Sequence, residues 1–463
     1  ILTHINGNPL RPVVLMNHGG VVQIHGNRFG ISIRECHYLH LSGKGDPAHF
    51  YGIQIRKVSA GAGVGIGDKS SDIELDHCWI EDCPIAGIYA KTDPDCSFQV
   101  NRENFTQYHT VIHDNYIART GNEGMYIGSS HYLGMTLPCV DRDTVVLPPI
   151  LIGVKIYNNI VFHTGWDGIQ VSSAEECQIY GNLIIDDSQA GVPDQMSGIL
   201  IGGGTRCDCY HNLIHDGKGD GIDFLGLAGS KIHDNIIVRA GQNFFPQDPS
   251  KTKHGIFVRI TGGPSSQDPV WITHNTLIDS KSSPVQILDL NQGTLQLQNN
   301  LMVGRPGRIG GISKIEEDTY LTVKDNRFFA TCKDAEISLN DYRPFFIMPH
   351  FADKNNRVNA KGGEITGTRE LQALGSRPAL LVNQILPQQQ GKFLVIPYVA
   401  KNLHTVRVSL YLPSGKKVLE VKLQPKDTGI QYTKIHLTQI PKGAGTYTIS
   451  DNGVIKKGSY FHY

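Results

Sequence analysis

The sequence predicts an all-β chain whose first part is a solenoid of stacked coils and whose last part is a small antiparallel β unit. A six-residue phrase with Asn in its fourth position recurs between residues 112 and 328. Apolar and polar residues alternate between these phrases, and no stretch of residues 1–330 keeps the 3.6-residue period of a helix. Short strands and turns repeated in this way predict a repeat architecture.

The recurring Asn defines one coil. Successive Asn residues lie 23–26 residues apart in the shortest units, and larger gaps mark insertions. The series is Asn115, Asn159, Asn182, Asn212, Asn235, Asn275, Asn300 and Asn326. An Asn at the same bend of every coil can pair its amide with the Asn above and below, so we expect one column of Asn side chains. In the phrase at 73–80, His77 takes the Asn position.

The cysteines offer a second alignment. ISIREC at 31–36 aligns with IELDHC at 73–78, which would hold Cys36 and Cys78 one above the other, close enough for a disulfide. The chain has 9 Cys, an odd number, so at least one thiol is free unless it bridges another chain.

A Gly-hydrophobic pair begins another strand of each coil. Long insertions follow this strand at 91–110 and 129–150, and others precede it at 186–196 and 241–253. Insertions on both sides of one sheet predict a groove along the solenoid axis, which suits an extended polymer. The pairs are Gly87-Ile88, Gly124-Met125, Gly168-Ile169, Gly198-Ile199, Gly221-Ile222 and Gly255-Ile256.

The Asn phrases and Gly-hydrophobic pairs resemble those of the pectin-lyase-like superfamily over residues 1–330. The resemblance implies a right-handed parallel β-helix solenoid. The superfamily contains lyases, hydrolases, epimerases and non-catalytic adhesins, so the likeness implies a fold and leaves the chemistry open.

The end of the chain predicts a second domain. Residues 384–463 hold 11 Lys and Arg against 3 Asp and Glu, which leaves 32 against 40 for residues 1–383. We expect residues 1–383 to form the β-helix with a C-terminal capping region, and residues 384–463 to form a small antiparallel β-sandwich. The segments SLYLPSGKKV and IPKGAGTYTI resemble the C-terminal sandwich modules of secreted Bacteroidetes proteins.

Polar and aromatic residues gather around the Gly-hydrophobic pairs. Asp223 lies in mid-strand at an outward position, where Asp is disfavoured. We expect the catalytic residues to be Asp167, Asp220, Asp223, His254 and Arg259. We expect the substrate-binding residues to be Tyr89, Lys91, Glu123, Tyr126, Trp166, Gln170 and Phe257.

Three functions fit these residues. β-Elimination on an acidic polysaccharide needs a cation and a base, which Lys91, Lys253, His254, Arg259 or bound Ca²⁺ can supply. A polysaccharide lyase is our first prediction. Hydrolysis needs a carboxylate pair: Asp167 and Asp220 would lie about 9.6 Å apart, and Glu123 and Asp167 about 5 Å. DGID at 220–223 resembles the catalytic NTDG-type segment of polygalacturonases, although Lys253-His254 stands where that family has a second acidic pair. A non-catalytic glycan-binding protein would use the aromatic residues as sugar platforms.

Composition excludes other classes. An acidic main body argues against nucleic acid as a ligand, and no apolar run of about 18 residues is present to cross a bilayer. We expect a monomer that is secreted, periplasmic or at the cell surface, with its export signal outside this sequence and a polysaccharide as its partner.

Overall fold

The computed structural model divides the chain into two compact units, Ile1–Cys332 and Lys333–Tyr463. In the first unit it describes residues 1–331 except 141, 261–267, 291–292, 305–311 and 315–319. In the second it describes residues 334–335, 388–390, 393–400, 405–411, 417–424, 429–436, 443–451 and 454–462. The predicted boundary at 383/384 lies outside the described residues and stays a prediction. Within the described residues, no helix is long and apolar enough to cross a membrane.

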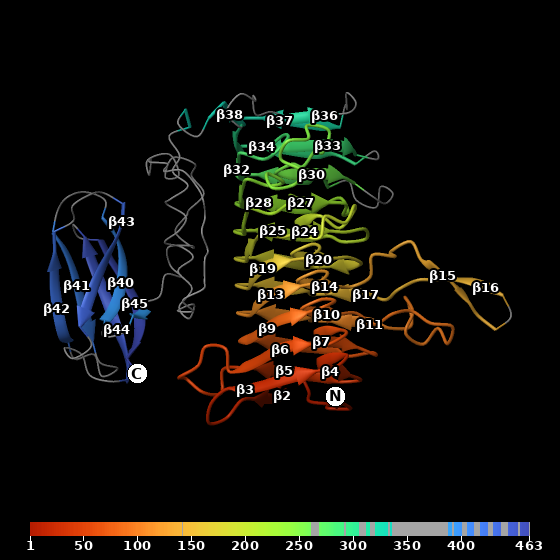
Figure 1. The fold of residues 1–463 in the computed structure, drawn as a ribbon, viewed down its shortest axis with the longest axis horizontal. Coiled ribbons are helices and arrows are strands. Elements are labelled where there is room, and N and C mark those ends of the chain that lie inside the picture. Colours follow the sequence, from red (N-terminus) through yellow and green to blue (C-terminus); the bar gives the residue numbers. More distant parts are fainter. Residues whose placement is uncertain are drawn as a thin grey trace. The chain divides into compact units, whose positions relative to one another are not determined.

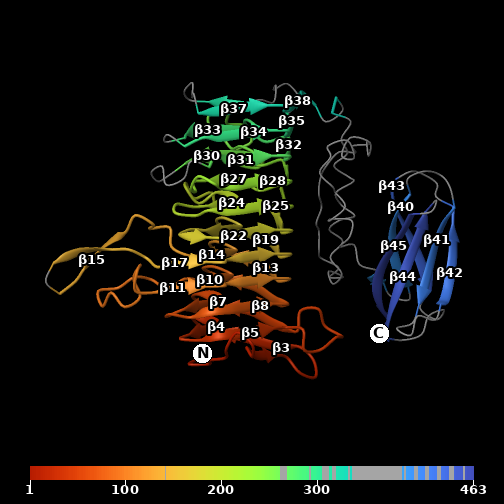
Figure 2. The same cartoon turned by 180° about the vertical axis from the view of Figure 1, so that it is seen from behind.

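The first unit is a right-handed parallel β-helix, as predicted. Three parallel 11-stranded sheets run along its axis, and each coil contributes one strand to each sheet (Figure 1; Figure 2 from behind). Sheet A comprises β1 (Leu2–Thr3), β4 (Phe29–Arg34), β7 (Ala62–Gly67), β10 (Ile88–Ala90), β14 (Met125–Ile127), β20 (Ile169–Val171), β24 (Ser197–Ile201), β27 (Asp220–Phe224), β30 (Ile256–Arg259), β33 (Val285–Asp289) and β36 (Ile312–Lys314).

The other two sheets hold the strands on either side of the recurring Asn. Sheet B comprises β2 (Val13–Met16), β5 (His37–Ser42), β8 (Ser71–Asp76), β12 (Val111–His113), β18 (Lys155–Tyr157), β22 (Cys177–Tyr180), β25 (Cys207–Tyr210), β28 (Lys231–His233), β31 (Val270–Thr273), β34 (Leu295–Gln298) and β37 (Leu321–Lys324). Sheet C comprises β3 (Val22–Gly26), β6 (Ile53–Val58), β9 (Cys78–Cys83), β13 (Tyr116–Thr120), β19 (Ile160–Thr164), β23 (Leu183–Ile185), β26 (Leu213–His215), β29 (Ile236–Val238), β32 (Thr276–Ile278), β35 (Leu301–Val303) and β38 (Arg327–Phe329).

Aliphatic side chains from all three sheets fill the interior. Ile222, Ile232 and Ile237 come from three sheets and are fully buried. Each is one member of a continuous core that extends through the stacked coils. Burial of such a side chain contributes about 1.5–3 kcal/mol, which is why alternating apolar residues suffice to place three short strands per coil.

The predicted Asn column is confirmed at the bend between sheets B and C. The Nδ2 of each Asn donates to the Oδ1 of the next, at 2.9–3.0 Å, from Asn115 to Asn326. The residue before each Asn has a positive φ, for example 54° at Asp234 and 58° at His274. Asp, Asn, His and Gly tolerate this left-handed conformation better than other residues, which explains their use at this position.

Two alignments from the sequence are wrong by register. Leu75 pairs with Ile112, so His77 corresponds to Asp114 and Cys78 takes the Asn position. The Cys78 backbone N–H accordingly donates to Asn115 Oδ1 at 2.9 Å. Cys36 precedes a strand of sheet B whereas Cys78 begins one of sheet C, and both are free and buried. They form no disulfide, because the aligned segments belong to different sheets.

The described residues of the second unit form two antiparallel sheets. The three-stranded sheet comprises β39 (Gln388–Gln390), β40 (Phe393–Ala400) and β43 (Gly429–His436), and the four-stranded sheet comprises β42 (Lys417–Leu423), β41 (Val406–Tyr411), β44 (Gly443–Asp451) and β45 (Val454–His462). Ile435 of the first sheet and Val408 of the second belong to one apolar cluster, as a small antiparallel sandwich requires.

Candidate active site

The strands of sheet A align the polar residues of the Gly-hydrophobic pairs in two columns. The register is continuous; Ser197 pairs with Asp220, and Leu200 with Asp223. The acid column is defined by the residue before each Gly, or before Pro284 in the last coil, and runs Ala86, Glu123, Asp167, Ser197, Asp220, His254 and Ser283. The outer column runs Tyr89, Tyr126, Gln170, Leu200, Asp223, Phe257 and Gln286.

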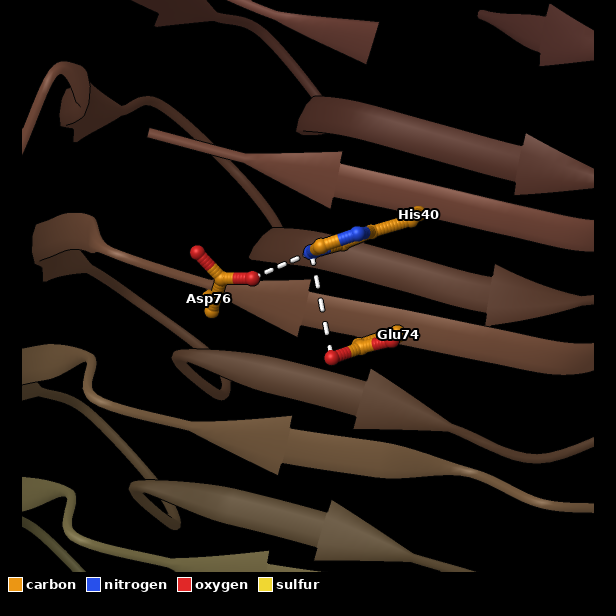
Figure 3. Close-up of side chains that lie close together, drawn as sticks. All are labelled: His40, Glu74 and Asp76. Atoms are coloured by element: carbon orange, nitrogen blue, oxygen red, sulfur yellow. Dashed lines mark hydrogen bonds and ion pairs between the residues drawn. The ribbon is translucent and has the colours of Figure 1, made fainter. Parts of the chain in front are cut away.

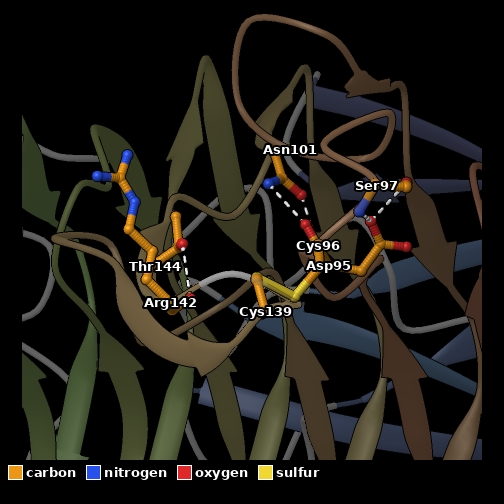
Figure 4. Close-up of a disulfide and its surroundings, with 7 residues drawn as sticks. All are labelled: Asp95, Cys96, Ser97, Asn101, Cys139, Arg142 and Thr144. Carbon is orange, nitrogen blue, oxygen red and sulfur yellow. Dashed lines mark hydrogen bonds between the residues drawn. A yellow bond between two sulfur atoms is a disulfide. The ribbon is translucent and has the colours of Figure 1, made fainter.

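Insertions leave the solenoid at both edges of sheet A. After β10, β14 and β20, the chain contributes β11 (Thr106–Tyr108), β17 (Ile150–Ile152) and β21 (Ala174–Glu175) to a small parallel sheet. The insertion after β14 also forms the hairpin of β15 (Met135–Pro138) and β16 (Asp143–Val146). The hairpin projects from the solenoid in Figure 1. A disulfide between Cys96 and Cys139 joins the insertions after β10 and β14 (Figure 4). The insertions 186–196 and 241–253 precede β24 and β30 at the other edge.

Buried carboxyl groups occupy the acid column. Asp167 is 1% exposed, its Oδ1 accepts a hydrogen bond from Ser197 at 2.6 Å, and burial raises its pKa well above the usual range. Burial also raises the pKa of Glu123 to about 7. The charge of Lys91 opposes this rise at Glu123, but burial outweighs it. Both therefore can carry a proton near neutral pH.

Asp220 has a different environment from the other acids. Its Oδ2 is 2.7 Å from Lys253 Nζ, and its Oδ1 accepts a hydrogen bond from the His254 backbone N–H at 2.6 Å. Burial opposes charge on the ammonium, but Asp220 outweighs it and raises the pKa of Lys253. The ammonium and the amide both stabilise negative charge on Asp220.

Asp223 lies in the outer column on the same strand as Asp220. Burial, and then the charge of Asp220, raise its pKa to about 8. Asp194, from the insertion before β24, raises it further, and Lys253 lowers it. The strand thus carries a carboxyl group with a raised pKa, Asp223, and a second one, Asp220, that is paired with an ammonium.

Among the described residues, four buried polar atoms in or next to the strands of sheet A have no hydrogen-bond partner. They are Asp167 Oδ2, Gln170 Oε1, Ser172 Oγ and Asp223 Oδ1. A buried polar atom without a partner costs about 1–3 kcal/mol. Gln170 and Asp223 lie in the outer column, where a ligand or water can complete their hydrogen bonds.

The remaining predicted residues divide into separate groups. Lys91 Nζ lies 5.1 Å from the ring centroid of Tyr89 and 4.9 Å from that of Tyr126, at the end of the site nearer the N-terminus. His254 Nδ1 is 2.7 Å from Ser283 Oγ, and burial lowers the His254 pKa. Trp166 and Phe257 are half-buried.

Arg259 does not join His254. It is exposed and lies five residues along the chain from His254, which corresponds to about 16 Å in an extended strand. The two basic groups predicted to face one space with the acids are thus at opposite ends of β30.

Two acids were missed by the sequence reasoning. Asp187, in the insertion 186–196, is 1% exposed and accepts a hydrogen bond from Ser188 Oγ at 2.6 Å. Burial raises its pKa to about 6, and its charge in turn acts on Asp167. Asp194 acts on Asp223 from the same insertion. The sequence contained a clue to both residues, because they lie in the insertion 186–196, which was already predicted to flank sheet A.

The predicted calcium site has no ready-made ligand set in the acid column. Within the described residues, one group of three His, Cys, Asp or Glu side chains has ligand atoms within 4.8 Å of one another, and it lies on sheet B. Calcium binding on sheet A stays a prediction.

Comparisons with known proteins concern the β-helix. Residues 151–332 match a family described as a right-handed beta helix region. No curated protein sequence matches the chain.

Solved structures of β-helix proteins resemble the chain at low identity. A GH136 lacto-N-biosidase from Eubacterium ramulus is 12% identical with a TM-score of 0.48, covering 72% of this chain. This chain spans 60% of the length of that protein. The tailspike protein 2 enzymatically active domain of bacteriophage CBA120 is 12% identical with a TM-score of 0.37, covering 96% of this chain and 72% of its own. The mannuronan C-5 epimerase AlgE4 A-module of Azotobacter vinelandii is 14% identical with a TM-score of 0.35, covering 67% of this chain and 91% of its own.

Proposed function

We propose that the chain is a glycoside hydrolase that binds an extended polysaccharide along sheet A. The observation that carries this proposal is the contrast between Asp220 and Asp223 on one strand. Asp220 is held by the Lys253 ammonium and a backbone amide, whereas the pKa of Asp223 is raised to about 8. Neighbouring carboxyl groups whose environments separate their protonation states are typical of acid and base pairs in catalysis.

In this proposal Asp223 is the general acid. It gives its proton to the glycosidic oxygen as the bond to the anomeric carbon breaks, and Asp220 supplies the negative charge that activates water or attacks that carbon. The sequence paired Asp167 with Asp220 instead. Asp223 is the better candidate acid because it is less buried than Asp167, and Ser197 already engages one oxygen of Asp167.

Elimination remains a second candidate because of the neighbouring residues. Lys253 is a cation at this site, and burial favours the neutral imidazole of His254 by lowering its pKa. A cation to neutralise a uronate carboxylate and a neutral base are the two groups that a lyase needs. Hydrolysis ranks first because Asp220 already neutralises Lys253.

Export from the cytoplasm is part of the proposal. The Cys96–Cys139 disulfide joins two surface insertions, and disulfides persist in oxidising compartments. A polymeric substrate too large to enter a cell is consistent with the same location.

The test is a panel of neutral and acidic polysaccharides assayed in parallel for new reducing ends and for absorbance of unsaturated uronides. Hydrolysis produces reducing ends without unsaturated products. Unsaturated products would assign the site to elimination, and binding without any cleavage would assign it to a glycan-binding protein. Asp208→Asn, on sheet B, is the control for loss of an acid outside the site.

A further inference from the structure

We propose that His40, Glu74, Asp76 and His113 on sheet B bind a transition-metal dication such as Zn²⁺. The proposal is independent of the function of sheet A. The four residues come from β5, β8 and β12, which belong to three successive coils. Figure 3 shows the His40 ring and the two carboxylates of β8 directed toward one another.

The ligand atoms of His40, Glu74 and Asp76 lie within 4.8 Å of one another, and His113 approaches the two carboxylates from the next coil. His113 Nε2 lies 3.0 Å from Glu74 Oε1 and 3.8 Å from Asp76 Oδ2. His40 Nε2 lies 3.9 Å from Glu74 Oε1 and contacts Asp76 Oδ2. In a tetrahedral zinc site with bonds of about 2.0–2.1 Å, neighbouring ligand atoms are about 3.3 Å apart. Each imidazole thus lies close to both carboxylates, and a shared ion would draw the two rings toward each other.

The groups behind these ligands have the arrangement that metal sites use. His113 Nδ1 is 2.7 Å from Asp114 Oδ2, which orients the ring so that Nε2 faces the carboxylates. Ser42 Oγ and His77 Nδ1 hold Asp76 Oδ1 at 2.6 Å and 2.5 Å, leaving Oδ2 for the site. A metal-binding His usually donates its second nitrogen to a carboxylate, and ligand carboxylates are hydrogen-bonded in turn.

The cluster is accessible from solvent. The His40 and His113 side chains are 25% and 12% exposed, and Glu74 is 42% exposed, whereas Asp76 is 3% exposed. Two imidazoles and two carboxylates suit zinc and its neighbours, whereas calcium and magnesium prefer oxygen ligands alone. Since four protein ligands fill a tetrahedral ion, the site would be structural, linking three coils.

A second His on the same sheet provides a matched comparison. His233 on β28 also lies between its own following Asp and an acid of the preceding coil: Nδ1 is 2.8 Å from Asp234 and Nε2 is 2.8 Å from Asp208. The residue paired with it in the preceding coil is Tyr210, whereas His113 pairs with Asp76. If both clusters were only ion-pair networks, replacing His113 or His233 would affect zinc binding equally. If the His113 cluster is a metal site, only the His113 substitution would weaken zinc binding.

The test is calorimetric titration of ZnCl₂ into metal-stripped, untagged full-length chain. We expect one zinc ion per chain, bound at least 100-fold more weakly by His113→Gln and His40→Gln, and about 10–100-fold more weakly by Asp114→Asn. The control His233→Gln should bind as the unaltered chain does. Cobalt should give the visible absorbance of a tetrahedral site, which His113→Gln abolishes.

Three results would overturn the proposal: no binding at millimolar zinc, binding unaffected by both ligand variants, or equal weakening by His233→Gln. Circular dichroism verifies that each variant is folded. If His113→Gln is unfolded, the exposed ligand variant Glu74→Gln decides the question in its place.

Discussion

Two columns of buried polar side chains run along the same solenoid, and they differ in how their hydrogen bonds are completed. In the Asn column every amide is paired with the next coil, and members such as Asn159 and Asn235 are fully buried. In the acid column, Asp167 leaves one oxygen without a partner, as does the neighbouring Asp223. Polar groups that serve the fold are satisfied within the fold. The acid column leaves hydrogen-bonding capacity for a molecule outside it.

Removing a member of the Asn column should have the largest effect. Asn235 donates to Cys209 O and Asn275 Oδ1 and accepts two hydrogen bonds from Asn212. Asn235→Ala leaves several buried partners unpaired, so we expect a loss of about 3–5 kcal/mol in the free energy of unfolding. Denaturant unfolding followed by circular dichroism measures it, and Asn243→Ala, at an exposed position, is the control. A loss below about 1 kcal/mol would contradict the structural role of the column.

Removing the carboxyl group of Asp223 should instead lower activity and leave stability intact. Asp223→Asn replaces a proton-holding carboxyl with an amide of the same size, so we expect turnover to fall by about 10²-fold or more. Stability should not fall. Because the raised pKa of about 8 makes the carboxyl costly to the folded state as pH rises from the ordinary Asp range toward that value, the Asn variant should be at least as stable at neutral pH.

Steady-state kinetics and melting temperature on one preparation test both halves of this prediction. Asp208→Asn on sheet B is the control for turnover. Full turnover in Asp223→Asn would move the acid to another residue, with Asp167 the next to substitute. A large drop in melting temperature would place Asp223 with the Asn column as a structural group.

The pH dependence of activity is a third way to test the comparison. A general acid must carry its proton, so kcat/KM should fall about tenfold per pH unit above about 8, following the pKa of Asp223. The alkaline limb should disappear from the residual activity of Asp223→Asn. A limb that persists unchanged in the variant would assign it to another group.

The sequence predicted the repeating part of this molecule and lost accuracy where the repeat is interrupted. The Asn column followed from spacing because every coil places the same residue at the same bend. The error between His77 and Cys78 arose because that coil lacks the Asn itself, and only strand register reveals which residue takes its place. The Cys96–Cys139 disulfide lies in two insertions, whose conformation no repeat determines.

For the candidate site, the sequence likewise predicted which residues share a column but not the environment of each residue. Because Asp167 and Asp220 each precede a Gly-hydrophobic pair, the sequence placed them in one column. Their different environments depend on Ser197 and Lys253, which contact them from other coils. Burial and partners of this kind are properties of the packed structure. They decide which of several aligned acids keeps its proton.

The smallest expected effect concerns His233, whose hydrogen bonds are satisfied on the outer face of sheet B. Burial opposes its charge, but the hydrogen bonds to Asp208 and Asp234 outweigh burial and raise its pKa to about 9. A raised His pKa stabilises the fold fully below the unfolded value near 6.5 and loses this contribution as pH rises through about 9. Because the ring is 26% exposed, solvent screening limits the gain, and His233→Gln should cost about 0.5–1 kcal/mol at pH 6 and almost nothing at pH 10. Denaturant unfolding at the two pH values measures the difference. A cost that is equal at both would show that the ring contributes through packing against Tyr210, with which it is stacked, and not through its charge.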